Sequence, residues 1–397
     1  MNGKIDNNIT FQAQTPLQKP SLGRSVRGDK GIWIIIVLLS LISLAAVYSS
    51  TTSLAFYQGK TSSFFLLKQL GFVTFGIATL FVCHLIPLGW YRKLSFLGMV
   101  VAIGLLTATI FMGTTYNDAT RWISFLGLSI QPSEVVKVAM VLYMAKAIED
   151  RKFDTFKEFA LYLMAPLGIL TLLMLWGSIS AGLILGGTAF LILLISGISF
   201  KHISKMMGIF FVGLVMVVVL AKWTPLFPRI ETAVSRITTF ADDEKGDTFQ
   251  ADHAKIAIAS GGIFGKGPGN STQRIILPKP YHDFIYAIIV EEYGILGGSA
   301  VLFLFLWFFY RTYLISKRCT RSFSSILVIG LGLLIVLQAI LHICVNVGLL
   351  PVTGQTLPLV SLGGTSFIAV SAAFGIILAV SRTIEKSETK EIKEVPL

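Results

Sequence analysis

The chain has few charged residues and almost no cysteine. Charged residues make up 14% of its 397 residues and hydrophobic residues 54%, so a soluble fold of this length could not bury so much apolar surface. The cysteines, which are scattered in or beside apolar segments, are Cys83, Cys319 and Cys344. Their spacing matches neither a metal site nor a disulfide framework. The composition therefore predicts a membrane protein that crosses the bilayer many times.

Acidic residues are scarcer than basic ones, at 21 against 33, which gives a formal charge of +12. A positive charge of this size can indicate nucleic-acid binding. Here, however, the basic residues lie in short connections between apolar runs, so we expect no nucleic-acid partner. They occupy both ends of the chain and every second connection. By the positive-inside rule, both termini are expected in the cytoplasm.

The apolar runs predict an all-α polytopic fold with ten transmembrane helices. Their expected bounds are residues 31–50, 64–86, 94–112, 132–147, 159–176, 181–199, 206–221, 283–310, 324–350 and 358–381. A long extracytoplasmic loop, residues 222–282, separates the seventh helix from the eighth. Residues 1–30 are expected to form a disordered cytoplasmic tail, residues 31–382 the transmembrane domain, and residues 383–397 a second cytoplasmic tail.

The segment LPKPYHDFIYAIIVEE, residues 277–292, combines two prolines with acids beside an apolar run. Proline cannot lie inside a helix, so the eighth helix is expected to begin near His282 or Asp283. Asp283 therefore lies at the outer mouth of a membrane helix, as an N-cap, as a chemical group, or as both. Glu291 and Glu292 follow about 12 Å deeper at ~1.5 Å per residue. Ionisable groups at such a depth are costly and by default indicate function.

A second polar group is expected between the third and fourth helices. Pro132 suits the first position of a helix, which places Glu134 and Lys137 one turn apart within the apolar run. Each charge alone would be expensive there. One interpretation is a structural ion pair. The other is that Lys137, or Arg121 in the preceding connection, neutralises a lipid phosphate.

The long outer loop contains two patterns. Residues 249–263 mix apolar and charged side chains in a way that predicts one amphipathic helix on the outer surface. Residues 261–270, GGIFGKGPGN, surround Lys266 with glycines but lack the Walker spacing, so a nucleotide site is not expected. Two interpretations remain: a turn whose amides and Lys266 approach a lipid pyrophosphate, or a plain flexible turn.

The ninth helix carries polar side chains at every fourth position. Gln338, His342 and Asn346 line one face, which either hydrogen-bonds to neighbouring helices or lines a cavity. In the segment 354–366, a proline and paired glycines are expected to break the tenth helix near its outer end. Irregular backbone at that depth is tolerated only where it lines protein or water, so this segment belongs to a cavity above Asp283.

Three parts of the chain together resemble the SEDS family, the shape, elongation, division and sporulation proteins. They are RWISFLGLSIQPSEVVK at 121–137, GIFGKGPGNS at 262–271 before LPKPYHDFIYAIIVEE at 277–292, and NVGLLPVTGQTLPLVSLGGTS at 346–366. The resemblance runs from the first helix to the tenth in the family's order. The polar N-terminal tail and the sequence TGQTLPL are closer to the division branch, FtsW, than to the elongation branch, RodA.

The resemblance implies a peptidoglycan glycosyltransferase that polymerises lipid II on the outer face of the bacterial cytoplasmic membrane and releases undecaprenyl pyrophosphate. It also implies a septal complex with a class B penicillin-binding protein, which crosslinks the product, and with other divisome proteins. The family's essential aspartate, in its usual LPExHTDF motif, falls on Asp283. The chain departs there, with Tyr281 in place of His and His282 in place of Thr. Residues 361–366 read SLGGTS where SYGGSS is common.

This chemistry needs a base at the attacking 4-hydroxyl of N-acetylglucosamine and positive charge near the pyrophosphate leaving group. We expect Asp283 to be the general base. A divalent cation, Mg²⁺ or Mn²⁺, is expected to share the charge of the leaving group, with no metal ligand identified. The residues expected to bind substrate are Arg121, Glu134, Lys137, Lys266, Gln338, His342, Asn346 and Ser361.

Other functions remain open at this stage. A lipid II flippase would use the same cavity to carry the headgroup across the membrane, with Asp283 only orienting it. Such a transporter would be expected to show an internal repeat, and the two halves of the chain show none that is convincing. A scaffold that only recruits the crosslinking enzyme leaves the buried polar residues unexplained. Among polymerases, a RodA-like role in elongation is the alternative to division.

Overall fold

The computed structural model describes residues 27–112, 114–116, 119–125, 128–221, 238 and 249–394. The predicted tail before residue 27 and almost all of residues 222–248 lie outside the described part of the chain. The helices are α1 (Lys30–Ser50), α2 (Thr52–Tyr57), α3 (Ser62–Leu85), α4 (Leu88–Met112), α5 (Pro132–Asp150), α6 (Phe156–Phe159), α7 (Ala165–Gly177), α8 (Ile179–Ile195), α9 (Phe200–Ala221), α11 (Phe249–Gly261), α12 (Ile285–Arg318), α13 (Ser322–Asn346) and α14 (Gly364–Glu394). A π-helical turn, η2 (Ala160–Met164), joins α6 to α7, and a 3-10 turn, η3 (Gln273–Ile275), follows α11.

Each predicted span coincides with a helix. In chain order these are α1, α3, α4, α5, the continuous run from α6 to α7, α8, α9, α12, α13 and α14. Within the described residues, seven helices are long and apolar enough to cross a bilayer, and α8 is apolar but shorter. The polytopic helical fold is thereby confirmed, while the number of ten spans stays a prediction.

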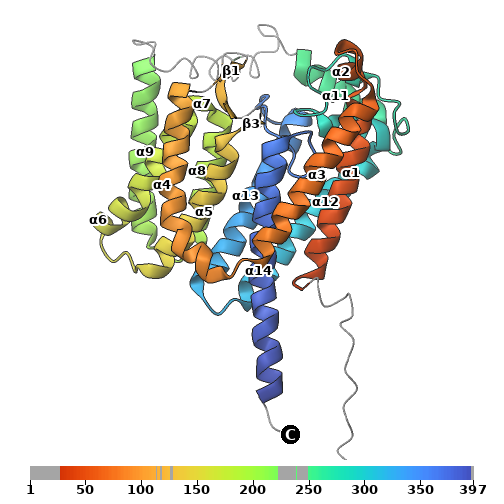
Figure 1. Cartoon of the computed structure of the whole chain (residues 1–397). Coiled ribbons are helices and arrows are strands. Elements are labelled where there is room, and N and C mark those ends of the chain that lie inside the picture. Colours follow the sequence, from red (N-terminus) through yellow and green to blue (C-terminus); the bar gives the residue numbers. More distant parts are fainter. Residues whose placement is uncertain are drawn as a thin grey trace, which may run out of the picture.

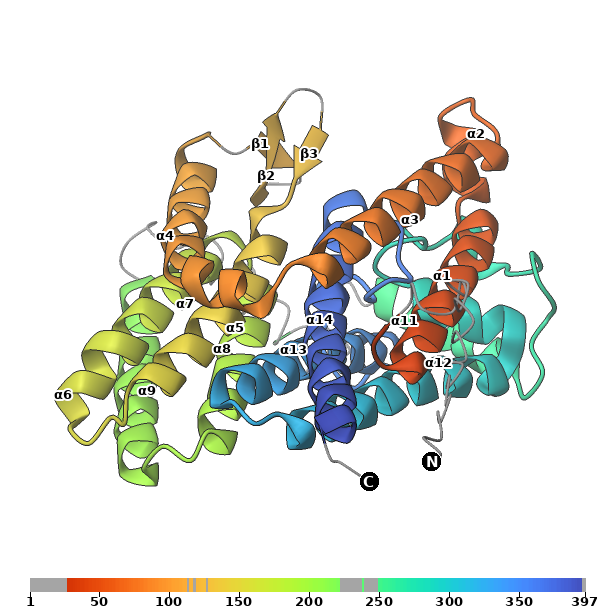
Figure 2. The same ribbon diagram turned by 60° about the horizontal axis from the view of Figure 1, so that its bottom comes forward.

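Two groups of helices flank a central pair (Figures 1 and 2). α13 and α14 lie between a group formed by α4, α5, α7, α8 and α9 and a group formed by α1, α3, α11 and α12. α13 packs against α5 and α8 on one side and against α12 on the other, and α14 packs against α3. In α13, 78% of the apolar stretch is buried, against 28% in α3 and in α4. The outer helices therefore keep much of their apolar surface for lipid.

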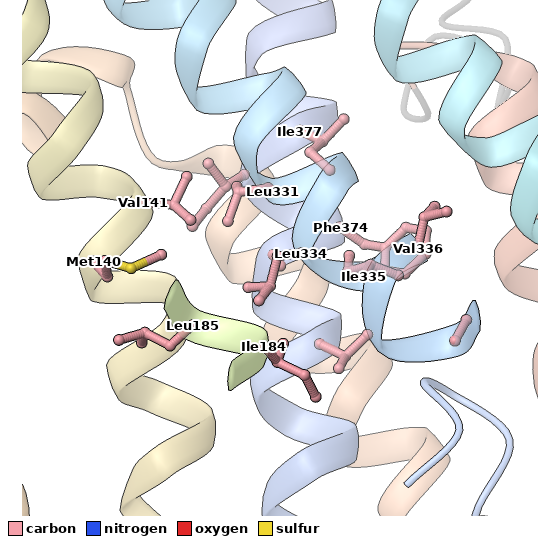
Figure 3. Packing of buried hydrophobic residues seen from close by; sticks show 14 of the residues in the cluster. Met140, Val141, Ile184, Leu185, Leu331, Leu334, Ile335, Val336, Phe374 and Ile377 are labelled. Atoms are coloured by element: carbon pink, nitrogen blue, oxygen red, sulfur yellow. The ribbon is translucent and has the colours of Figure 1, made fainter. Parts of the chain in front are cut away.

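The contacts around α13 form the centre of the apolar core (Figure 3). Leu331 of α13 lies with Met140 and Val141 of α5 and with Phe374 of α14 in one buried cluster. Gly330 permits the close approach of α13 to α5, because a Cβ there would lie 2.8 Å from Cγ1 of Val141. This packing fixes the position of α13, whose polar face carries three of the predicted site residues.

The basic connections lie at one end of the bundle. In Figure 1 the α3–α4, α5–α6, α8–α9 and α12–α13 connections are at the lower end, where α14 also leaves the bundle. α2, α11 and the sheet are at the opposite end. Arg92, near the start of α4, pairs with Glu149 and Asp150 at the end of α5, at 2.7 and 2.6 Å. The arrangement agrees with the predicted topology, in which the lower end is cytoplasmic and Asp283 faces outward.

The connection between α4 and α5 contains a small antiparallel sheet that the all-α prediction did not include. Its strands are, in spatial order, β1 (Thr114–Tyr116), β2 (Ala119–Phe125) and β3 (Leu128–Ile130). Thr115 pairs with Thr120, and Ser124 with Ser129. Threonine, isoleucine and aromatic residues, which favour strands, dominate β1 and β2. A short β signal next to two long apolar helices was too weak to be read from the sequence.

The ends of α12 and α14 differ from the predicted bounds in ways that bear on the site. α12 begins two residues after Asp283, and Gly294 interrupts it with φ 70° and ψ −174°. α14 begins only at Gly364, so residues 347–363 are irregular, as the proline and paired glycines predicted. At its other end α14 continues as a helix to Glu394, through most of the region expected to be a tail.

Candidate active site

Two irregular segments meet in front of α12 and hold Asp283. One leads into α12, and the other is residues 347–363, between α13 and α14. Ser361 Oγ donates a hydrogen bond to the carbonyl of His282 at 2.9 Å, and Asn346 Nδ2 donates to the carbonyl of Asp283 at 3.1 Å. The backbone of the aspartate is therefore fixed both from α13 and from the segment before α14.

A small apolar cluster supports this segment from the side of α11. Ala254 and Ala257 of α11 pack with Leu277, Phe284 and Ile288. α11 is the helix predicted in the long loop, and its presence is confirmed. Its alanine face lies against the start of α12 rather than being free for another surface. The helix of the outer loop and the segment that carries the acid thus form one packed unit.

The carboxylate of Asp283 is partly exposed, at 21%, and accepts a hydrogen bond from Nδ1 of His282 at 2.6 Å. Phe284 occupies the N-cap position of α12 and no side chain caps the helix, so the N-cap interpretation of Asp283 is wrong. Burial raises the pKa of Asp283, but the hydrogen bond and charge of His282, with the charges of His342 and Lys279, outweigh burial and hold the pKa below its ordinary value. The group is therefore ionised at neutral pH.

The polar face of α13 hydrogen-bonds to the segment that precedes α14. Gln338 Nε2 donates to the carbonyl of Thr356 at 3.1 Å, and Nδ1 of His342 lies 2.7 Å from the carbonyl of Gln355. Gln338, His342 and Asn346 are all buried. The sequence left two interpretations of this face: hydrogen bonding to neighbouring elements, or the lining of a cavity. The observed contacts are of the first kind. A further role in binding substrate stays a prediction.

Glu134 and Lys137 form the ion pair that their spacing suggested. Lys137 Nζ lies 2.8 Å from Glu134 and donates to Oε1 of Gln338 at 2.6 Å. Lys137 is 1% exposed and Glu134 4%. The hydrogen bond from Lys137 to Gln338 ties α5 to α13, and Gln338 in turn holds Thr356 beside the site. The structural interpretation accounts for these contacts, because the ammonium is already neutralised and enclosed.

Lys266, which was expected to approach a lipid pyrophosphate, pairs in the structure with an acid of α12. Its Nζ lies 2.6 Å from Glu291, which also accepts hydrogen bonds from the backbone N–H of Thr272 at 3.0 Å and from the Ser271 hydroxyl. Glu291 lies eight residues after Asp283, about 12 Å along the helix at ~1.5 Å per residue. The glycine-rich turn is therefore tied to α12, and the structure does not bring Lys266 to Asp283.

Glu292 anchors the other side of the same helical turn. It accepts a hydrogen bond from Ser49 at the end of α1, and Arg274 lies 3.9 Å from its carboxylate. Both acids were expected to indicate function because they lie within an apolar run. The structure instead uses Glu291 and Glu292 to fasten α1 and the outer loop to the part of α12 that precedes Gly294.

Gly265 explains why the turn is rich in glycine, and it gives a first test of the structure. A Cβ on Gly265 would lie 2.2 Å from the carbonyl oxygen of Glu292, and its φ is +82°. Gly269 has a similar φ of +77° but nothing within 4 Å. We expect Gly269→Ala to cost about 1–2 kcal/mol for the left-handed backbone. Gly265→Ala should cost clearly more, because it adds a clash with rigid backbone.

Thermal denaturation of Gly265→Ala and Gly269→Ala in detergent micelles measures this difference. Because the two glycines have similar positive φ angles, +82° and +77°, the matched pair isolates the close approach to α12. Equal melting temperatures would contradict the packing of the glycine-rich turn described above.

Arg121 lies in β2, but its side chain is outside the described part of the structure. Its expected contact with a phosphate stays a prediction. The remaining residues expected to bind substrate divide into two groups. Lys266 stands apart with Glu291. The others join one network around the segment that holds Asp283, and they are Glu134, Lys137, Gln338, His342, Asn346 and Ser361.

Three residues of this network received no role from the sequence, namely His282, Gln355 and Thr356. Gln355 and Thr356 act partly through their backbone carbonyls, which no sequence pattern identifies. His282 had a signal, since it stands where the resembled motif has threonine. Only the structure shows that its imidazole is bonded to the carboxylate of Asp283.

Known proteins resemble this chain over nearly its whole length. The family described as cell cycle protein, named for FtsW, RodA and SpoVE, matches residues 29–386. The stage V sporulation protein E of Bacillus subtilis (strain 168) is 32% identical over 359 residues, which cover 88% of this chain and 95% of that protein. A protein of the same organism named "Probable peptidoglycan glycosyltransferase FtsW" is 32% identical over 386 residues, covering 92% and 93%.

Solved structures share the fold at lower identity. A chain from work described as "Structural coordination of polymerization and crosslinking by a peptidoglycan synthase complex" superposes with a TM-score of 0.73 at 22% identity, covering 90% of this chain and 98% of that one. The rod shape determining protein RodA of Thermus thermophilus gives 0.66 at 22% identity, covering 89% and 97%. The family match over nearly the whole transmembrane region, with relatives at this identity, shows that the chain belongs to the FtsW, RodA and SpoVE family of cell cycle proteins.

Proposed function

We propose that this protein is a peptidoglycan glycosyltransferase that polymerises lipid II into glycan strands on the outer face of the bacterial cytoplasmic membrane. The observation that carries the proposal is the placement of Asp283. It is an ionised, partly exposed carboxylate beside the outer end of a membrane helix, and its backbone is held by polar residues of two further elements. Relatives named for this activity align with 92% of the chain, which supports the proposal.

The reaction makes one bond and breaks one. The 4-hydroxyl oxygen of the acceptor attacks the anomeric carbon of the donor, and the bond from that carbon to pyrophosphate breaks, with undecaprenyl pyrophosphate leaving with the electron pair. The hydroxyl proton has to be removed as the new bond forms, and Asp283 supplies the negative charge on which that removal depends. Pyrophosphate leaves with little need for protonation, so the second carboxylate of a glycosidase is not required.

The leaving group carries negative charge that needs a counter-charge. Lys137 and Lys266 are already paired with Glu134 and Glu291, so Arg121 and a divalent cation are the better candidates. We propose that Mg²⁺ or Mn²⁺ accompanies the pyrophosphate. Among the residues that the structure describes, no group of three His, Cys, Asp or Glu side chains could hold such an ion. Phosphate oxygens and water would then supply most of the ligands, as is usual for Mg²⁺.

We further propose that the enzyme works beside a class B penicillin-binding protein, with other divisome proteins, at the division septum. The neighbour with a TM-score of 0.73 belongs to a complex whose description joins polymerisation with crosslinking. The FtsW relatives favour a role in division, and a RodA-like role in elongation is the alternative.

Reconstitution tests the function directly. Purified protein, combined with its penicillin-binding partner, lipid II and Mg²⁺, is expected to produce glycan strands that gel electrophoresis resolves, and chelation of the cation is expected to stop their formation. A flippase would instead move lipid II between the leaflets of vesicles and make no strands. Transfer of lipid II without strands, in a preparation whose partner binds penicillin, would overturn the proposal.

A further inference from the structure

His282 and Asp283 form a hydrogen-bonded pair at the exposed edge of the site. Nδ1 of His282 lies 2.6 Å from Oδ1 of Asp283. An ionised carboxylate only accepts, so Nδ1 carries the proton, and in the neutral imidazole Nε2 presents a lone pair. Within the described chain no residue hydrogen-bonds to Nε2, and the side chain of His282 is 24% exposed. A basic nitrogen is therefore available next to the carboxylate on which the proposed reaction depends.

The pair is held in place by its backbone. The N–H groups of both residues donate to the carbonyl of Lys279, at 3.0 and 3.2 Å. The carbonyl of His282 accepts from Ser361, and that of Asp283 accepts from Asn346. Four hydrogen bonds from three places in the chain thus fix the main chain that carries the two side chains. Such pre-organisation is what a proton-transferring pair needs, because the geometry does not have to be assembled during the reaction.

The two groups differ in how well they suit proton abstraction near neutral pH. A general base works best when its pKa lies near the working pH. A carboxyl group loses its proton at about pH 4 in model peptides, well below neutral pH. Oδ1 of Asp283 also already accepts the Nδ1–H of His282. Imidazole is the side chain that changes charge between about pH 5 and 8. An aspartate that orients Nδ1–H and leaves Nε2 to act as the base is a known division of labour in acyl transfer.

We propose that His282, and not Asp283 as expected from the sequence, is the catalytic base of this enzyme and takes the proton of the acceptor hydroxyl on Nε2. Asp283 is then the positioning residue that holds Nδ1–H and stabilises the imidazolium. This assignment rests on the proposed glycosyltransferase function. As the hydroxyl oxygen bonds to the anomeric carbon and pyrophosphate departs with its electron pair, the proton moves to Nε2. It then passes to water, which restores neutral His282 for the next addition.

The surroundings of the pair leave His282 as the accessible nitrogen base. The charged and titratable groups that act on the pair are Lys279 in its own segment and His342 from α13. Residues 347–363, which pack against it, contain no ionisable side chain. His342 is only 1% exposed, and its Nδ1 is engaged with the carbonyl of Gln355. It therefore cannot meet an acceptor sugar unless the structure opens.

The test is the pH dependence of polymerisation with lipid II, Mg²⁺ and the penicillin-binding partner. Wild-type kcat/KM is expected to fall at acid pH, because a protonated Nε2 cannot take the proton of the acceptor hydroxyl. His282→Gln is expected to lower the rate by about 10²- to 10⁴-fold and to remove this acid limb from the residual activity. His282→Ala is expected to regain activity when imidazole is added, which also shows that the variant is folded. His253→Gln, on α11, is the control and should keep the wild-type profile.

Each result has a definite meaning. His282→Gln with wild-type rate and the same acid limb would overturn the assignment, while strands made by the wild type would still support the proposed function. An acid limb lost in His342→Gln but kept in His282→Gln would assign the base to the buried histidine instead. Failure of the wild type to make strands at any pH would overturn the proposed function, and the assignment with it.

Discussion

Asp283→Asn is expected to abolish polymerisation while the protein stays folded. Asparagine keeps the size of the side chain but removes the negative charge, and its amide can turn a donor toward His282. The imidazole then loses the acceptor that fixes Nδ1–H, and the reaction loses the charge that compensates proton removal. Replacement of an aspartate that orients a catalytic histidine typically costs ~10⁴-fold in rate, so strands should fall below detection in a standard gel assay.

Asp252→Asn is the matched control for this experiment. Asp252 is a surface acid of α11, on the same outer end of the bundle, and its side chain is 47% exposed beside Lys255. An exposed pair of this kind contributes little to stability. This variant should therefore keep both its activity and its melting temperature. Polymerisation by Asp283→Asn at more than about a tenth of the wild-type rate would contradict the positioning role of the carboxylate, since loss of an aspartate that orients a catalytic histidine costs ~10⁴-fold.

Lys137→Met is expected to give the largest loss of stability. The substitution keeps the length of the side chain but leaves the Glu134 carboxylate enclosed between α5 and α13 without its counter-ion. Breaking a buried ion pair from one side costs about 3–5 kcal/mol, because a charge stays buried and uncompensated. Gln338 also loses the donor to its Oε1. The free energy of unfolding, measured by chemical denaturation in detergent micelles, should fall by this amount.

The double variant Glu134→Gln, Lys137→Met separates the charge effect from simple loss of packing. With both charges removed, the loss should be much smaller than in Lys137→Met alone, since no unpaired charge remains. If the single and double variants were equally unstable, the loss would not come from an uncompensated charge on Glu134. The alternative interpretation, in which Lys137 binds a lipid phosphate, would then be favoured.

The helical fold followed from the sequence because the signal for each span is local. Apolar runs of about 20 residues have few alternatives to a membrane helix, and the basic connections set their direction. The break of α12 at Gly294 was not predicted, because an isolated glycine within an apolar run is common in membrane helices. Its backbone is required by contacts with the glycine-rich turn, some 30 positions earlier, which no local pattern carries.

Many residues of the candidate site could be named from the sequence, but most contacts between them could not. Spacing alone suggested the contact of Glu134 with Lys137, because residues three apart on a helix are neighbours. Lys266 and Glu291 are 25 positions apart, and only the folded loop brings them together. From the sequence, Asp283 was expected at the outer mouth of the eighth helix, and the structure places it two residues before α12. Its bond to His282 depends on the conformations of two adjacent side chains, which the sequence does not specify.

The break at Gly294 also bears on how the chain resides in the bilayer. At ~1.5 Å per residue the 34 residues of α12 extend about 51 Å, well beyond a hydrocarbon thickness of about 30 Å. The residues after the break, 295–318, suffice to cross the membrane and contain no Asp or Glu. Asp283, Glu291 and Glu292 all precede the break. The three carboxylates can therefore remain in a protein-walled outer compartment, and the cost of placing an acid at the centre of the lipid phase never arises.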